Sequence, residues 1–530
     1  MAFARVKPAL IFPAVHKPLS LRQNLLPQMI KNSEAAWQRR HYPQAMEILE
    51  QATRLAPNEP LLWLYLGRCH GLRYDYAAAE RCLEKAIRVE GWKTESFLKA
   101  GRYCLPFRGY ELAARFFERA LKHDGHAVEI LAELARIYLR QGRLDDAAEL
   151  LERALQLKSD FTPALLVRAR LHRMAGQLEA AEKILRRLIT QPGPNGWIQA
   201  EGWYELGATL DRQERYDEAM AAFREAKLVK LPVPAPPNAD WKTMEADSKQ
   251  MAESLSVEAF RRWHELGGTF PRRRLALLCG HPRSGTTLLE QILDSHPGIV
   301  SAEETQVFYD EALVPLARGL PPETLSLLTT LESASPERLR QSRADYFHCT
   351  ERFIGRSIGE RLLIDKNPSL TSLIPAFARI FPEARFLVVL RDPRDVCLSC
   401  FMQPLFPTAP IHSVYSSLEA TAAQYVSVMS LWQAVKPLLP CPFLEVRYED
   451  MTENLELVAR RILEFLGVPW DDRVLTFQQQ TRNKLVRSPT YGDVKKPISR
   501  GAIGRWRHYR KYFEPYLEKL EPLVKAFGYE

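Results

Sequence analysis

Small residues recur with a fixed period along the first half of the chain. Between about residues 26 and 229, alanines stand 34 positions apart, with a four-residue insertion before the last one: Ala45, Ala79, Ala113, Ala147, Ala181 and Ala219. Glycine, serine or alanine forms a second column with the same period: Ser33, Gly67, Gly101, Ala135, Ala169 and Gly207. Because small residues let two helices approach closely, this pattern predicts stacked pairs of antiparallel helices.

The 34-residue period resembles that of tetratricopeptide repeats. About six repeats over residues 26–230 would form an all-α solenoid with a concave face, preceded by an extension at residues 1–25. The insertion near residues 191–196 should lengthen one loop. The repeats contain no catalytic cluster, so we expect either a binding surface for a polypeptide partner or a scaffold. A dimerisation arm, and hence a homodimer, is left open.

The pattern changes after a proline-rich linker at residues 231–238. Residues from Trp241 to about Gly267 have a helical pattern, so residues 231–270 read as a linker with a bridging helix. From residue 271 to residue 530, short apolar runs at residues 275–280, 361–365, 385–390 and 443–447 alternate with helical patterns, one of them closed by Gly467. This alternation predicts an α/β domain, in which helices flank a parallel sheet.

A glycine-containing loop directly follows the first apolar run. Gly280 and Gly285 have the spacing of the nucleotide-triphosphate P-loop, but Thr286 stands where that loop has its lysine. Strand, glycine loop and helix together form an anion-binding arrangement. Arg283 adds a cation, and Thr287 adds a hydroxyl. The loop therefore suits a donor with a single 5′-phosphate better than it suits ATP with Mg²⁺, and a nucleotide kinase is the weaker reading.

The run Pro282-Arg-Ser-Gly-Thr-Thr-Leu288 resembles the 5′-phosphosulfate loop of sulfotransferases that use 3′-phosphoadenosine 5′-phosphosulfate (PAPS). The arginine in this loop, followed by Glu303-Glu304-Thr305, is similar to the tyrosylprotein sulfotransferase branch and its bacterial relatives with tetratricopeptide repeats. The resemblance covers roughly residues 273–530. It implies that PAPS is the donor and that its 5′ end is bound by five loop residues: Arg283, Ser284, Gly285, Thr286 and Thr287.

The resemblance also implies a catalytic pair. Glu304 corresponds to the base that takes the proton of the acceptor hydroxyl, a task for which a carboxylate is suited. Lys366, in the run Asp365-Lys-Asn-Pro368, corresponds to the lysine that stabilises the leaving phosphate, together with Arg283. From spacing alone, Glu304 could equally be a capping or surface residue. Gln306 stands where the family commonly has an arginine near its peptide substrate, which leaves the acceptor open.

Further residues match the nucleotide-binding positions of this family. Arg391, at the end of an apolar run, and Ser399, eight residues later, resemble the 3′-phosphate motif. Tyr448 matches a position near the nucleotide, although a core tyrosine would look the same. Lys496 and the run from Gly504 to Trp506 resemble a C-terminal segment that closes over the donor.

Composition narrows these expectations further. The chain has 530 residues, a hydrophobic fraction of 46%, a net charge of +9 and eight scattered cysteines. No nucleic-acid module and no cluster with metal-ligand spacing stands out, so we expect neither nucleic acid nor a required metal. The apolar start is broken by Pro8 and Pro13, which does not suit a signal peptide. No run is long enough to span a membrane. A cytoplasmic enzyme is therefore expected.

The family resemblance therefore implies a PAPS-dependent sulfotransferase, and it favours a protein tyrosine as acceptor. Sulfation of a carbohydrate or small-molecule hydroxyl is the alternative within the same chemistry. A catalytically silent repeat adaptor is the alternative outside it. The adaptor reading predicts degraded site residues, whereas Arg283, Glu304, Lys366, Arg391 and Ser399 are all present.

Overall fold

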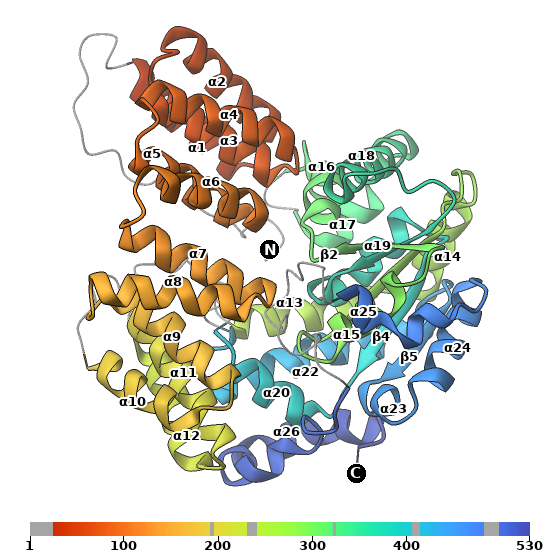
Figure 1. Ribbon diagram of the computed structural model, residues 1–530. Coiled ribbons are helices and arrows are strands. Elements are labelled where there is room, and N and C mark those ends of the chain that lie inside the picture. Colours follow the sequence, from red (N-terminus) through yellow and green to blue (C-terminus); the bar gives the residue numbers. More distant parts are fainter. Residues whose placement is uncertain are drawn as a thin grey trace. The chain divides into compact units, whose positions relative to one another are not determined.

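The computed structural model describes residues 25–190, 196–229, 241–321, 325–404, 414–481 and 498–529. Contacts along the chain divide it into two compact units, of which one ends at Gly176 and the other begins at Gln177 (Figure 1). The boundary thus falls inside the repeats. The expected extension at residues 1–25, apart from Leu25, the core of the 191–196 insertion and the proline-rich linker lie outside the described residues.

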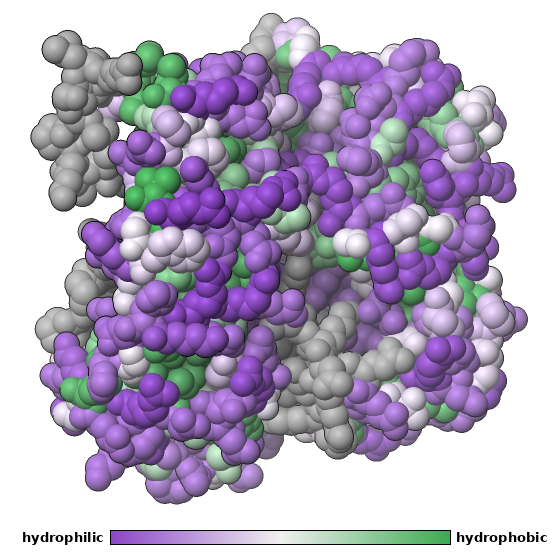
Figure 2. Space-filling view, turned by 45° about the horizontal axis from the view of Figure 1, so that its top comes forward, coloured by the Kyte–Doolittle hydropathy of each residue, from purple (hydrophilic) through white to green (hydrophobic). Residues whose placement is uncertain are grey.

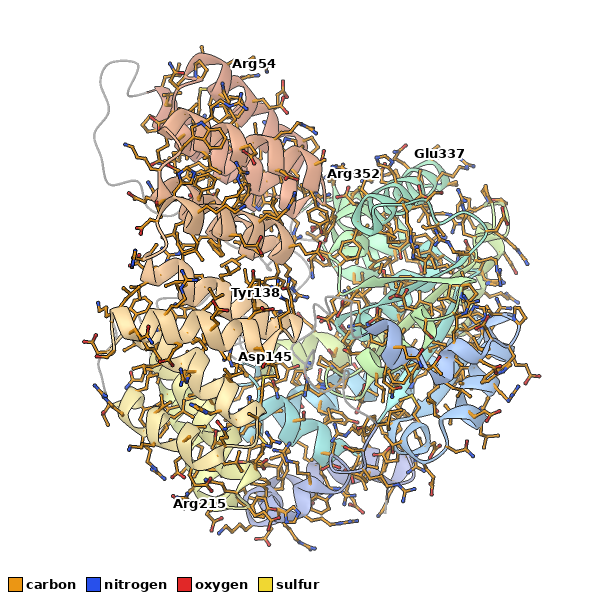
Figure 3. The ribbon with its side chains drawn as sticks, in the orientation of Figure 1. Arg54, Tyr138, Asp145, Arg215, Glu337 and Arg352 are labelled. Carbon is orange, nitrogen blue, oxygen red and sulfur yellow. The ribbon has the colours of Figure 1, made fainter. Side chains whose placement is uncertain are left out.

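The first unit consists of paired helices, as the repeat pattern predicts. Its helices are α1 (Leu25–Gln38), α2 (Tyr42–Leu55), α3 (Pro60–Leu72), α4 (Tyr76–Glu90), α5 (Thr94–Cys104), α6 (Tyr110–His123), α7 (Val128–Gln141), α8 (Leu144–Leu157) and α9 (Thr162–Met174), with the short turn η3 (Leu105–Phe107). Consecutive pairs such as α3 and α4 pack closely. Between α6 and α7, the hydroxyl of Tyr138, labelled in Figure 3, donates to Glu118 over 2.8 Å.

The periodic small residues lie where helices touch. Ala79, Ala113 and Ala147 are fully buried. At Gly101, an added Cβ would stand 2.1 Å from Cε1 of Phe117, so no larger residue fits without movement of that ring. Close approach of the paired helices therefore explains why the column tolerates only small side chains.

Three helices of the repeat region belong to the second unit: α10 (Leu178–Ile189), α11 (Trp197–Arg212) and α12 (Tyr216–Leu228). Arg215, labelled in Figure 3, immediately precedes α12 and pairs with Glu182 of α10 over 2.8 Å and with Glu218 over 2.6 Å. These ion pairs link α10 to α12. The last helices of the repeats are therefore packed as part of the unit that also holds the sheet.

The expected bridging helix over residues 241–267 is two helices. α13 (Trp241–Ser254) ends before Leu255, and α14 (Val257–Gly267) begins after Ser256. Ser256 has extended backbone with φ −136°, and its hydroxyl accepts a hydrogen bond from the Ala259 N–H. This is an N-cap, which starts a new helix instead of continuing the previous one. The prediction missed it because the apolar pattern runs across both helices.

The second unit contains a five-stranded parallel sheet in the order β2-β3-β1-β4-β5. Figure 1 labels β2, β4 and β5. Its strands are β1 (Leu275–Gly280), β2 (Ile299–Glu303), β3 (Leu362–Lys366), β4 (Arg385–Leu390) and β5 (Phe443–Arg447). The predicted α/β class is confirmed. The sequence pattern did not predict β2, whose short run is interrupted by Ser301. The apolar run at residues 443–447 is the strand β5, which lies half-buried at the edge of the sheet.

Helices cover both faces of this sheet. On one face, Ala276, Leu278 and Ile364 pack against apolar residues of the helices that follow β1 and β5. On the other face, Phe386 of β4 meets an aromatic cluster that includes Phe377. The helical segments are α15 (Thr286–Asp294), η4 (Phe308–Leu313), α16 (Val314–Ala317), α17 (Leu327–Glu332), α18 (Pro336–Ile354), η5 (Pro368–Leu373), α19 (Ile374–Ile380), α20 (Pro393–Phe401), α22 (Leu418–Val435), η6 (Lys436–Leu438), α23 (Tyr448–Glu453), α24 (Leu455–Leu466), η7 (Asp472–Leu475), α25 (Phe477–Thr481), η8 (Arg505–Tyr509) and α26 (Arg510–Ala526).

The surface is mainly hydrophilic on the face that Figure 2 shows, with hydrophobic residues in small groups. Within the described ranges, no helix combines the length and apolarity that a membrane crossing requires. All eight cysteines are buried thiols, and Cys397 and Cys400 lie one turn apart on α20.

Candidate active site

The loop between β1 and α15 has the shape of an anion cradle. Gly280 and Gly285 have φ angles of +130° and +106°, in the left-handed region that favours glycine. A Cβ on Gly280 would stand 2.4 Å from the Val389 carbonyl oxygen. Gly285 then caps α15, so the first N–H groups of this helix, on Thr286 and Thr287, lie at the loop. An anion at this place would meet the positive end of the helix dipole.

Two arginines and a serine meet beside this loop. The Arg283 Nε donates to the Ser399 hydroxyl over 3.0 Å. The Arg391 guanidinium follows β4 and donates to the Arg283 carbonyl oxygen over 3.1 Å. Residues from the first loop, from the end of β4 and from α20 are thereby brought together. The structure thus brings Arg391 and Ser399 together through Arg283, and their assignment to a 3′-phosphate stays a prediction.

Lys366 lies at the buried end of β3 with its ammonium among acids. Its side chain is fully buried, and its Nζ lies 2.8 Å from Glu304 Oε1 and 3.7 Å from Glu303 Oε1. It also donates to the Thr287 hydroxyl over 3.4 Å. The expected base and the expected lysine are therefore direct partners, and Thr287 connects the pair to the anion cradle.

The backbone fixes this pairing. Glu303 and Lys366 are register partners on β2 and β3, and the Glu304 N–H donates to the Lys366 carbonyl oxygen over 2.8 Å. The Asn367 amide donates to the Thr305 carbonyl oxygen over 2.8 Å. The two polar turns after neighbouring strands are thus held side by side at the carboxyl edge of the sheet.

The charge of Lys366 is stabilised in spite of its burial. Burial lowers the pKa of Lys366, but the carboxylates of Glu304, Glu303 and Glu290 raise it by more, so the pKa lies above its ordinary value. The ammonium therefore stays protonated at neutral pH. A permanent cation at this position can neutralise negative charge that develops on a leaving group.

Backbone strain concentrates at two site residues. From β1 to the end of the described chain, Arg283 (φ +73°) and Glu304 (φ +48°) are the described non-glycine residues with positive φ. Such conformations cost of order 1–3 kcal/mol and persist where the surrounding structure imposes them, often at functional sites. Both residues are ones that the sequence pattern singled out.

Tyr448 contacts the cradle from the end of the edge strand β5. It begins α23 directly after β5, and its ring lies so close to Gly285 that an added Cβ would stand 2.6 Å from Tyr448 Cδ2. The Arg391 guanidinium lies over the same ring, 4.9 Å from its centroid. Tyr448, which the sequence analysis placed near the nucleotide, thus contacts the glycine loop at Gly285 and also Arg391, the residue that follows β4. Lys496 lies outside the described residues.

Asp395 lies on α20, between Arg391 and Ser399 in the chain, and no pattern in the sequence assigned it a role in the site. Its neighbour Arg394 makes a local contact, pairing with Asp392 over 2.8 Å. Asp395, by contrast, accepts hydrogen bonds from the Gly504 N–H over 2.6 Å and the Trp506 N–H over 2.8 Å. It thus holds a segment more than 100 positions away in the chain, a pairing that no local pattern could reveal.

Two buried polar groups at the cradle lack partners within the described part of the chain. They are the Ser284 hydroxyl oxygen and the Arg391 Nε. A hydroxyl and a guanidinium N–H are donors that fit phosphate or sulfate oxygens. The residues present therefore fit a doubly anionic nucleotide. No group of three metal-ligating side chains occurs among the described residues.

Models of known protein families match both the helical repeats and the domain with the sheet. The model of the sulfotransferase family matches residues 276–472, from β1 to η7. Tetratricopeptide repeat models match residues 31–93, 110–156, 139–193 and 200–230. The chain carries a sulfotransferase-family domain behind tetratricopeptide repeats. The described residues from Arg283 to Tyr448 that the sequence analysis assigned to the site lie inside the matched part, and the run from Gly504 to Trp506 lies beyond it.

Relatives of the sulfotransferase domain are distant in sequence. An uncharacterised protein of Aquifex aeolicus is 28% identical over 342 residues, which cover 63% of this chain and 43% of that protein. Protein-tyrosine sulfotransferase A of Caenorhabditis elegans is 25% identical over 277 residues, which cover 47% of this chain and 66% of the enzyme. The chain thus spans less than half of the first relative and about two thirds of the second.

Among solved structures, the sulfotransferase domain from the olefin synthase of Synechococcus PCC 7002 is 24% identical, with a TM-score of 0.32. The match covers 45% of this chain and 89% of that chain.

Proposed function

We propose that the sulfotransferase domain moves a sulfuryl group from PAPS to an acceptor hydroxyl, with protein tyrosine as the favoured acceptor. The observation that carries this proposal is the Glu304–Lys366 pair, 2.8 Å apart, beside a glycine loop that has Thr286 in place of the P-loop lysine. Membership of the domain in the sulfotransferase family supports sulfuryl transfer as the chemistry.

The cradle would hold the 5′ end of the donor. The N–H groups of Gly285, Thr286 and Thr287 and the Ser284 hydroxyl are suited to the 5′-phosphosulfate, and Arg283 adds a positive charge. Since Lys366 donates to Thr287, the loop and the lysine would act on neighbouring oxygens. No metal is needed for charge neutralisation in this arrangement, because two protein cations lie at the cradle.

The second cluster would hold the 3′-phosphate. Arg391 and Ser399 converge there through Arg283, and Arg391 lies over the Tyr448 ring. A 3′-phosphate offers oxygens to a buried guanidinium that now donates to neutral carbonyls. Charge-assisted bonds to phosphate are stronger than bonds to neutral acceptors, so this exchange favours binding. Lys496 is assigned to the same nucleotide on the family resemblance alone.

Glu304 is proposed as the general base. PAPS supplies a sulfuryl group on a good leaving group, adenosine 3′,5′-bisphosphate. As the acceptor oxygen forms its bond to sulfur and the sulfur–oxygen bond to the nucleotide breaks, the hydroxyl proton passes to the Glu304 carboxylate. Lys366 stabilises the charge that gathers on the leaving phosphate, with Arg283. A donor oxygen that attracts Lys366 also weakens its bond to Glu304, which frees the carboxylate to accept the proton.

The acceptor is inferred from relatives. Several of the proteins similar to this domain are named protein-tyrosine sulfotransferases, which favours a tyrosine hydroxyl. The repeats would recruit the polypeptide that carries it, in keeping with the protein–protein contacts typical of such repeats. We place the reaction in the cytoplasm, where buried thiols such as the eight in this chain persist.

The proposal is tested by incubating the full chain with PAPS and a set of tyrosine-containing peptides, and by following sulfated product by mass spectrometry. The matched control replaces the peptide tyrosine with phenylalanine, which removes only the hydroxyl. Sulfation of the tyrosine peptide alone is the expected result. Release of adenosine 3′,5′-bisphosphate only when a saccharide is supplied would move the acceptor to the carbohydrate class. No turnover with any hydroxyl would contradict the proposed function.

A further inference from the structure

Asp211, the next-to-last residue of repeat helix α11, holds residues of the C-terminal part of the chain. Its side chain is only 9% exposed and pairs with the Arg505 guanidinium. The Tyr509 hydroxyl donates to Asp211 Oδ1 over 2.6 Å. Burial and the Asp211 carboxylate raise the pKa of Tyr509, so this hydroxyl stays a donor at any physiological pH.

Aromatic packing reinforces this contact. The Tyr216 ring, at the start of α12, stacks on His508 with a centroid distance of 4.4 Å and meets Tyr509 edge to face at 5.4 Å. Helices α11 and α12 and the turn η8 belong to the same compact unit. The end of the repeats is therefore fixed to the turn from Arg505 to Tyr509.

The segment just before and within this turn reaches the proposed donor site. Asp395, on α20, accepts from the N–H groups of Gly504 and Trp506. The Arg391 guanidinium donates to the Ala502 carbonyl oxygen as well as to that of Arg283. Residues 502–506 therefore lie between Asp211 on one side and Arg391 on the other.

We propose that Asp211 is a positioning residue for the nucleotide site, acting through the segment of residues 502–509 on Arg391. Asp211 fixes Arg505 and Tyr509, and this fixes the Ala502 carbonyl that orients the guanidinium of Arg391. A residue of the repeats thereby sets the affinity for the 3′-phosphate of the donor. This inference rests on the proposed function, because it assigns Arg391 to that phosphate.

A matched control lies on the next helix of the repeats. Asp217, on α12, also contacts C-terminal residues. Its carboxylate accepts a hydrogen bond from the Lys511 ammonium over 2.7 Å and one from the Tyr512 hydroxyl over 2.9 Å. Its side chain is 65% exposed, and its partners lie on α26, beyond the segment of residues 502–509. Asp217 and Asp211 thus differ in which C-terminal element they hold.

The experiment measures calorimetric binding of two nucleotides to the full chain, adenosine 3′,5′-bisphosphate and adenosine 5′-monophosphate. In Asp211→Asn, bisphosphate affinity should fall about tenfold, within the usual size of a coupling between sites. Affinity for the monophosphate should stay within about twofold, because it lacks the phosphate that Arg391 contacts. Asp217→Asn should change neither. Tyr509→Phe, which removes one hydroxyl and keeps the ring, should show a smaller loss with the same selectivity.

Unchanged bisphosphate affinity in both Asp211→Asn and Tyr509→Phe would overturn the inference. So would an equal loss for both nucleotides, which indicates general loosening of the fold. If Asp211→Asn does not fold, Tyr509→Phe decides. Failure of the wild-type chain to bind bisphosphate would instead remove the proposed function, so the two failures are distinguishable.

Discussion

The two cations of the site, Lys366 and Arg391, are held in opposite ways. Lys366 is fully buried and pairs with the carboxylates of Glu304 and Glu303. Arg391 donates to two neutral backbone carbonyls, those of Arg283 and Ala502. One cation is neutralised by acids next to it in the sheet, while the other is oriented by backbone from distant parts of the chain.

We infer from this difference that the two cations have separate roles, Lys366 in sulfuryl transfer and Arg391 in nucleotide binding. The two acceptors of Arg391 in the described part of the chain are neutral carbonyls, so we expect an anion to displace them readily and to bind tightly at this end. An anion near Lys366 competes with the Glu304 carboxylate for the ammonium, so its binding gains less net free energy. The same competition weakens the bond between Lys366 and Glu304 and frees the carboxylate to accept a proton. We therefore assign nucleotide affinity mainly to the Arg391 end and turnover mainly to the Lys366 end. The predictions on Glu304, Arg391 and Ser399 each change one end and leave the other intact, and the prediction on Asp365 concerns the stability of the strand that carries Lys366.

The largest effect is expected from Glu304→Gln. The amide keeps a hydrogen bond to Lys366 but cannot take a proton, so turnover should fall by about 10²–10⁴-fold. Affinity for adenosine 3′,5′-bisphosphate, measured by calorimetry, should hardly change. Glu303→Gln is the control, because Glu303 lies 3.7 Å from the same ammonium, and it should lose far less activity. Equal turnover in wild type and Glu304→Gln would remove this residue as the base.

A second prediction concerns Asp365, whose side chain points to the opposite face of β3 from Lys366. Burial raises the pKa of Asp365 to about 7, although the Tyr346 hydroxyl donates to its carboxylate over 2.9 Å. The folded state therefore binds this proton more tightly than the unfolded state does. The resulting stabilisation is fully present below about pH 4 and is lost as the pH rises through about 7.

Asp365→Asn tests this directly, because the amide cannot ionise. Between pH 5 and pH 8, the unfolding free energy of the wild type should fall by roughly 2–3 kcal/mol relative to that of the variant. Urea unfolding at the two pH values provides the measurement. If the unfolding free energies of the wild type and the variant changed in parallel with pH, Asp365 would keep an ordinary pKa in the folded state.

Arg391→Ala changes the end of the site to which we assign nucleotide affinity. Loss of a charge-assisted bond to phosphate should weaken bisphosphate binding about 10–100-fold. Binding of adenosine 5′-monophosphate should be affected much less, since that nucleotide lacks the 3′-phosphate. A variant that binds both nucleotides as the wild type does would detach Arg391 from the proposed site.

The smallest effect is expected from Ser399→Ala. This change removes one neutral hydroxyl, which accepts from Arg283 over 3.0 Å. Bisphosphate affinity should fall about three- to tenfold, in line with a single hydrogen bond, and turnover at saturating donor should be retained. A large loss of turnover at saturation would place Ser399 at the transfer end and contradict the division between the two ends.

The local patterns of the sequence predicted the elements of the site well. The runs at residues 275–280 and 385–390 are β1 and β4, and the glycine loop between β1 and α15 was expected at Gly280 and Gly285. Helix pairs in the repeats followed from their period. These features depend on contacts within one element or one repeat, which leave a periodic record in the sequence.

Features that depend on distant pairs could not be predicted. The direct Glu304–Lys366 pair requires the adjacency of β2 and β3, and β2 gave too short a pattern to recognise. The bonds of Asp395 to Gly504 and of Asp211 to Arg505 join segments roughly 100 to 300 positions apart. A single sequence holds no local signal for such partners, so only the fold reveals them.

The most direct test of the account is calorimetric titration of the wild-type chain with adenosine 3′,5′-bisphosphate and, separately, with ATP and Mg²⁺. The account predicts tight binding of the bisphosphate and little binding of ATP, because the loop has Thr286 where a triphosphate site needs lysine. Binding of ATP with Mg²⁺ without binding of the bisphosphate would contradict it and would make the domain a nucleotide-triphosphate enzyme.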